Sequence, residues 1–124
     1  MKILVALLFV FLMSGMIMTA NAAERLYHVV SFKFKATAKA EDIKNVEESF
    51  QALKQKIPQI GSFEWGANVS KEKHDKGFTH CFILTFKSEK DRDAYIEHPD
   101  HKAFGKTVGP VLDDVFVVDF WSKN

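Results

Sequence analysis

Two hydrophobic periods alternate along the chain. Apolar side chains recur at every second position over residues 26–34, and the same alternation returns over 62–69, 78–87 and 115–121. A period of two predicts β-strands, so these four segments are the expected strands. Over residues 40–57 the apolar positions instead recur every three or four residues, which predicts an amphipathic helix between the first two strands.

A second helical region is predicted between the third and fourth strands, beginning near residue 88. Ser88 is a favourable N-cap residue, and Asp91, three positions later, resembles the acid of a capping box. Pro99 interrupts this helix and can open another helical segment, because proline is tolerated at the first helical position. Gly109 and Pro110 then end that segment.

The predicted order βαββαβ is the split βαβ, or ferredoxin-like, arrangement of an α+β protein, with helices on one face of the sheet. The opposite face would be polar if it met water, yet Tyr27, Val29, Cys81 and Ile83 fall on it. The last strand is apolar on both sides. A sheet that is apolar on both faces has to be covered twice, so we expect a second copy of the chain to cover the open face in a homodimer.

The first residues have the order of an export signal. Lys2 precedes an apolar run over residues 3–18, and Ala20 and Ala22 supply the small residues of a cleavage site. This order predicts a signal peptide over 1–22, a mature domain over 23–124, and export to the periplasm or secretion. The alternative is an uncleaved membrane anchor, although the run is short for a hydrocarbon core of ~30 Å. After cleavage we expect no membrane association.

The charge balance and the cysteine content limit the expected binding partners and disulfides. The chain has 17 Lys and Arg residues against 16 Asp and Glu residues and no basic run, so nucleic acid is not an expected partner. Cys81 is the only cysteine, which excludes an intrachain disulfide. We expect its thiol to be buried; the alternative is a disulfide between two subunits near the twofold axis, in an oxidising compartment.

Two histidines lie on strand faces that are otherwise apolar. His28 belongs to the first predicted strand and His80 to the third. Either they are core histidines hydrogen-bonded to their neighbours, or they line a pocket between the sheet and the helices. Imidazole is suited to proton transfer near neutral pH, and a buried imidazole needs a polar partner in either case.

The remaining histidines do not form a metal site by pattern. His98 and His101 are three residues apart, but two histidines make an incomplete ligand set and no third ligand is fixed by spacing. We therefore expect neither a metal nor a cofactor. His98 is interpreted as a turn residue beside Pro99, and His74 as a solvated residue of a polar loop.

Several segments together resemble the stress-responsive A/B barrel (Dabb) family of dimeric α+β barrels. They are HVVSFKFK at 28–35, IP at 57–58, FEWG at 63–66, GFTH at 77–80, LTF at 84–86, YIEHPDH at 95–101 and VDF at 118–120. The resemblance covers nearly the whole mature region. It implies a dimer in which the sheets of two subunits close into a barrel.

One branch of that family consists of plant polyketide cyclases, which perform an intramolecular aldol condensation without a cofactor. The resemblance implies Tyr95 and His101 as the catalytic pair, with His28 and His80 lining the pocket. His101 would remove a proton next to a carbonyl, and Tyr95 would orient it or donate to the enolate oxygen. Three functions stay open: an exported binding protein for a small apolar or carbonyl ligand, a cofactor-independent enzyme of this kind, and a structural oligomer without a ligand.

Overall fold

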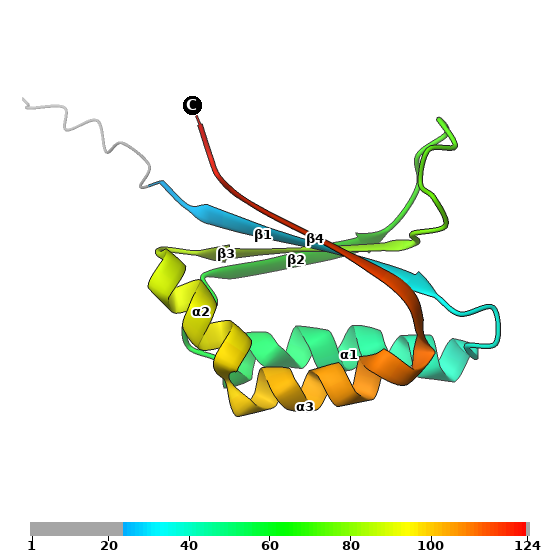
Figure 1. The fold of residues 1–124 in the computed structure, drawn as a ribbon, viewed down its shortest axis with the longest axis horizontal. Coiled ribbons are helices and arrows are strands. Elements are labelled where there is room, and N and C mark those ends of the chain that lie inside the picture. The colour runs from blue at the N-terminus through cyan, green and yellow to red at the C-terminus, as the bar shows by residue number, and fades with distance from the viewer. Residues whose placement is uncertain (1–23, 124) are drawn as a thin grey trace, which may run out of the picture.

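The computed structural model describes residues 24–123, so the predicted signal peptide lies outside the described part (Figure 1). The elements are, in order, β1 Leu26–Phe34, α1 Ala40–Lys56, β2 Ser62–Ala67, β3 His80–Phe86, α2 Glu89–Glu97, α3 Pro99–Val108, a 3-10 turn Gly109–Val111 and β4 Leu112–Trp121. Figure 1 shows two layers, with all three helices on one face of the sheet. The predicted ferredoxin-like α+β fold is confirmed.

The sheet is antiparallel throughout and its strands lie in the order β2-β3-β1-β4. β1 is therefore central and pairs with both β3 and β4. In this register His28 lies between Leu84 of β3 and Asp119 of β4. Residues far apart in the chain thus meet on the face that carries the helices.

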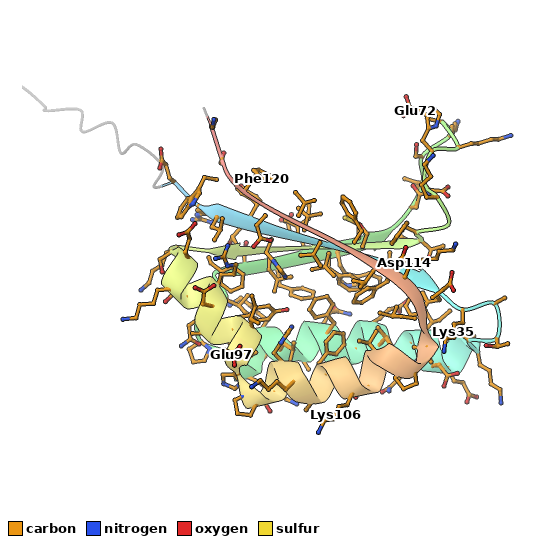
Figure 2. The ribbon with its side chains drawn as sticks, viewed as in Figure 1. Lys35, Glu72, Glu97, Lys106, Asp114 and Phe120 are labelled. Carbon is orange, nitrogen blue, oxygen red and sulfur yellow. The ribbon has the colours of Figure 1, made fainter. Side chains whose placement is uncertain are left out.

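The hydrophobic core lies between this face and the helices. Alternate residues of β1 and β3 point into it, and α1 contributes Val46, Phe50 and Leu53 at helical spacing. Figure 2 shows side chains filling the space between the two layers. The buried apolar residues include Leu26, Val30, Phe32, Phe82, Leu84, Phe86, Tyr95, Phe104 and Val108.

The break between α2 and α3 follows the sequence signals. Oγ of Ser88 accepts a hydrogen bond from the backbone N–H of Asp91 at 3.1 Å, which caps α2. Pro99 occupies the first turn of α3, and Nδ1 of His98 accepts from the backbone N–H of Asp100 at 3.1 Å. His98 is therefore the turn residue predicted, with its side chain capping α3.

No helix among residues 24–123 covers the opposite face of the sheet, and the connection between β2 and β3 rises from the sheet on this open side (Figure 1). Tyr27 of β1 stacks on Phe120 of β4 there, with ring centroids 5.1 Å apart. β4 exposes apolar side chains on both of its faces: Val115, Phe116, Val117, Val118, Phe120 and Trp121. Cys81 is exposed, so the expectation of a buried thiol is wrong for the single chain.

A further property of the described residues concerns membranes. None of the helices found between residues 24 and 123 is both long enough and apolar enough to cross a bilayer.

Candidate functional site

The break at Pro99 brings Tyr95 and His101 together. Tyr95 lies in α2 and is 1% exposed, with its ring 5.2 Å from that of Phe86. Because the chain changes direction at Pro99, His101 in α3 folds back, and its ring centroid lies 4.5 Å from that of Tyr95. The pair predicted to be catalytic is therefore in contact.

His101 is held in one orientation by the end of the preceding helix. Its Nδ1 lies 2.9 Å from the backbone oxygen of Ile96, an acceptor only, so Nδ1 carries the proton of this bond. The neutral ring then has its lone pair on Nε2. Burial lowers the pKa of His101 from its ordinary value, and the neighbouring His28 lowers it further, although the bond to Ile96 and the charge of Glu97 act in the opposite direction. Near neutral pH this imidazole is a base.

Tyr95 has the complementary property. Burial raises the pKa of its hydroxyl above the ordinary range, and the negative charge of Asp119 raises it further. The phenol therefore keeps its proton at neutral pH and can donate a hydrogen bond, but it does not act as an anionic base.

His28 joins this pair from the sheet. Its ring centroid lies 5.6 Å from that of Tyr95, with the two planes at 71°. Nδ1 of His28 lies 2.6 Å from Oδ1 of Asp119, and Oδ2 of Asp119 accepts from Arg92 at 3.1 Å. His28, Tyr95 and His101 thus form one cluster, which we call the Tyr95 cluster.

Asp119 and Arg92 were not found by sequence reasoning. One signal was available, because Asp119 is the lone acid in the apolar strand segment 115–121. It also falls on the same face of its strand as Val115 and Val117, which the alternation places toward the helices. No comparable signal marks Arg92, which lies on a helix rich in charged residues.

His80 lies in a separate cluster. It pairs with Phe32 in the sheet, four residues along β1 from His28, so the two histidines are offset by about 13 Å along the strand direction at ~3.3 Å per residue. Its Nε2 lies 2.9 Å from Oε1 of Glu47 on α1, and its Nδ1 lies 2.8 Å from Oγ1 of Thr79. These contacts match the interpretation of His80 as a core histidine that is hydrogen-bonded to its neighbours.

Aromatic rings fill the interior between His28 and His80. Phe50 lies 4.5 Å from both Phe82 and Phe104, measured between ring centroids, and 5.8 Å from Phe32. A hollow of about 630 Å³ lies instead on the open side of the sheet, at the base of the β2–β3 connection; its lining includes Ser31, Phe78, Cys81, Ile83 and Phe116. The structure therefore brings Tyr95, His101 and His28 together but not His80.

Metal-ligating groups do not gather in this part of the chain. Between residues 24 and 123, no three His, Cys, Asp or Glu side chains lie close enough to hold a metal ion.

Comparison with known proteins gives a family match. The chain matches the model of the Stress responsive A/B Barrel Domain over residues 26–122. It is 35% identical over 96 residues to a stress-response A/B barrel domain-containing protein of Arabidopsis thaliana, covering 75% of this chain and 82% of that protein. It is 26% identical over 97 residues to olivetolic acid cyclase of Cannabis sativa, covering 78% of this chain and 96% of the cyclase.

Solved structures agree with this match. The protein At3g17210 from Arabidopsis thaliana is similar with a TM-score of 0.76 and 32% identity, covering 80% of this chain and 96% of that one. A dimeric protein with a ferredoxin-like fold from Bacteroides fragilis is similar with a TM-score of 0.63 and 27% identity, covering 77% and 94%.

Proposed function

Since this chain belongs to the stress responsive A/B barrel domain family, we propose that it binds a small, largely apolar carbonyl compound at the Tyr95 cluster and moves a proton at the carbon next to the carbonyl. The observation that carries this proposal is the contact between a neutral imidazole and a protonated phenol, with ring centroids 4.5 Å apart. Nε2 of His101 takes the proton from carbon. The Tyr95 hydroxyl donates to the carbonyl oxygen as negative charge develops on it.

The relationship to olivetolic acid cyclase supports the same step. An aldol cyclisation starts with removal of a proton from the carbon next to a carbonyl, and the resemblance at residues 95–101 supports Tyr95 and His101 as the residues for this work. At 26% identity the relative supports the kind of chemistry, while the substrate depends on side chains around the site.

Burial decides the direction from which a ligand approaches. Tyr95 and His28 are 1% and 6% exposed, whereas His101 is partly exposed. A carbonyl compound therefore reaches the cluster past His101. The apolar rings of Tyr95 and Phe86 lie behind it and favour an apolar substituent.

Deuterium incorporation into acetophenone tests this proposal. The ketone is incubated with the purified protein in D2O, and the loss of its methyl proton signal is followed by NMR. We expect His101→Ala to slow exchange by roughly 10²–10⁴-fold, the usual contribution of a general acid or base. Tyr95→Phe should slow exchange with little change in the KM of the ketone, because the hydroxyl acts mainly in the transition state. His74→Ala, which removes an exposed loop imidazole, is the control and should leave the rate unchanged.

Each other result selects a different function. Full exchange activity in His101→Ala would contradict the assignment of the base. Saturable binding of acetophenone without exchange would favour the binding protein predicted as the first alternative. Neither binding nor exchange, with an unchanged fold by circular dichroism, would favour the structural oligomer, for which the packing of Phe50, Phe82 and Phe104 is the supporting observation.

The open face of the sheet supports a proposal about the oligomeric state. We propose that a second copy covers this face, because Phe116, Val118 and Phe120 of β4 lie on it and are 41–53% exposed in the single chain. Exposed apolar area of this kind gains about 25 cal/mol for each Å² that is removed from water. The similar protein from Bacteroides fragilis is dimeric by its description, which supports the proposal.

The prediction of where the protein is located rests on the sequence alone. We propose that residues 1–22 direct export to the periplasm or the exterior and are then removed. N-terminal sequencing of the protein from its own host should begin at Ala23. A protein that starts at Met1 and sediments with membranes would support the anchor instead.

A further inference from the structure

A continuous set of hydrogen bonds links α2 to β1 through the edge strand. Arg92 of α2 donates from Nη1 to Oδ2 of Asp119 at 3.1 Å, and Oδ1 of the same carboxylate lies 2.6 Å from Nδ1 of His28. The Arg92 guanidinium also donates twice to Oδ1 of Asp93, from Nε at 3.1 Å and from Nη2 at 3.0 Å. The guanidinium is therefore clamped between two carboxylates, and its direction is fixed.

Both oxygens of Asp119 are engaged, so its carboxylate cannot rotate away from His28. The Asp119 and Arg92 side chains are 23% and 21% exposed, and that of His28 is 8% exposed. Hydrogen bonds between charged groups at this depth are stronger than those at the surface. An ionised carboxylate only accepts, so the proton between Asp119 and His28 belongs to Nδ1. The second ring nitrogen of His28, Nε2, is then the atom that exchanges protons.

His28 and His101 thus have the same hydrogen-bonding arrangement, and the ring of each lies beside that of Tyr95. Each ring has Nδ1–H bound to an acceptor, Asp119 for His28 and the oxygen of Ile96 for His101. Each leaves Nε2 outside that bond. Two imidazoles with fixed tautomers can exchange protonation states during one reaction, one as acid and the other as base.

We propose that Arg92 is a positioning residue that acts through Asp119 to fix His28 as the second proton carrier of the Tyr95 cluster. This inference rests on the proposed function above. As Nε2 of His101 takes the proton, the C–H electron pair forms the new C=C bond and the carbonyl π pair moves to oxygen. That oxygen then takes the proton from Nε2 of His28, which in this proposal enters the step as the imidazolium. His28 is left neutral with Nδ1–H on Asp119, His101 is left protonated, and the total charge is unchanged.

NMR of protein with ¹⁵N-labelled histidine tests the positioning role without a substrate. At one fixed neutral pH, the wild-type protein should show a downfield His28 Nδ1 proton that exchanges slowly with water. Arg92→Gln should speed that exchange by roughly 10-fold or more, and Arg92→Lys, which keeps a charge within reach of Asp119, should restore it in part. Lys90→Gln removes an exposed charge from the same helix and should leave the signal unchanged.

The acetophenone assay then asks whether the position of His28 matters for turnover. Arg92→Gln should lower kcat by roughly 10–100-fold with KM changed far less, and it should have no further effect in a His28→Ala background. The proposal would be overturned if Arg92→Gln and His28→Ala lowered kcat additively. It would also be overturned if folded Arg92→Gln showed the wild-type exchange rate of the His28 Nδ1 proton. Arg92 would then only connect α2 to β4. If even the wild-type protein exchanges nothing, the proposed function fails, and the NMR signal of His28 still decides the role of Arg92.

Discussion

The rings of Phe50 and Phe104 stack with their centroids 4.5 Å apart and their planes at 17°. This contact joins α1 to α3 directly beneath the sheet, where Phe82 of β3 meets Phe50 at the same centroid distance. At the centre of the domain, Phe50 of α1 therefore contacts both a strand and a second helix through its ring.

Removing the Phe50 ring should be among the most damaging changes in the domain. Phe50 is 1% exposed, and truncation of a buried phenylalanine to alanine costs about 3–5 kcal/mol through lost burial and the cavity left behind. Urea titration of Phe50→Ala should show this loss in the free energy of unfolding. Val69→Ala, at a side chain that is 90% exposed, should change it by less than about 0.5 kcal/mol. A loss below about 1 kcal/mol for Phe50→Ala would mean that the interior is loosely packed.

The lowered pKa of His101 predicts that acid destabilises the fold. Below the ordinary histidine pKa of about 6.5, the unfolded chain binds a proton that the folded chain does not yet bind, so unfolding is favoured. The contribution of His101 is complete above that pH and is lost as the pH falls toward the lowered pKa of the folded state.

Unfolding free energies measured between about pH 7 and about pH 5 should therefore fall less steeply in His101→Gln than in the wild-type protein. His74→Gln, at an exposed position of the β2–β3 connection, should keep the wild-type slope. Identical slopes for His101→Gln and the wild-type protein would contradict the effect of burial on this imidazole.

The cap of α2 makes a smaller and separable contribution. Ser88→Ala removes the acceptor of the 3.1 Å bond from Asp91 N–H, and such a loss costs about 1 kcal/mol. Ser49→Ala makes the same chemical change inside α1, where alanine is the better helix former, and should not destabilise. Thermal unfolding of the two variants compares them directly. Equal melting temperatures would show that α2 does not depend on this cap.

A single charged substitution on the open face should dissociate the proposed dimer. Val29 lies on the open face, and an aspartate there would be buried without a partner in both copies, at a cost of roughly 3–5 kcal/mol each. Light scattering of Val29→Asp at micromolar concentration should give a monomer and a lower melting temperature. Val69→Asp is the matched control, because Val69 lies on the β2–β3 connection and is 90% exposed. A wild-type protein that is itself a stable monomer would end the proposal.

The sequence predicted the elements well because their signals are local. Alternation in 26–34 and the three- and four-residue spacing in 40–57 each reflect one face turned toward the core, and the observed β1 and α1 agree within a residue. The break at Pro99 was also predictable, because proline fits the first turn of a helix and not its middle. The family resemblance is confirmed by the match over 26–122.

The sequence named Tyr95, His101 and His28 for the candidate site, but it predicted a contact only where the residues share a segment. Tyr95 and His101 come from one motif, and the contact between them follows from the helix break. Asp119 reaches His28 only through the register of β1 with β4, across 91 residues of sequence. Such pairing is a property of the whole sheet and leaves no trace in the local pattern. The separation of His28 from His80 has the same origin, since both lie on apolar faces but at different heights of the sheet.

The central position of β1 also has a consequence for the time at which the protein can fold. β1 is the first strand to leave the ribosome, yet its two neighbours begin only at residues 80 and 112. A nascent chain that ends before these residues cannot complete the middle of its sheet, because loop closure precedes the gain from distant pairing. The sheet can therefore close around β1 only after β4, the last strand of the described residues, has been synthesised.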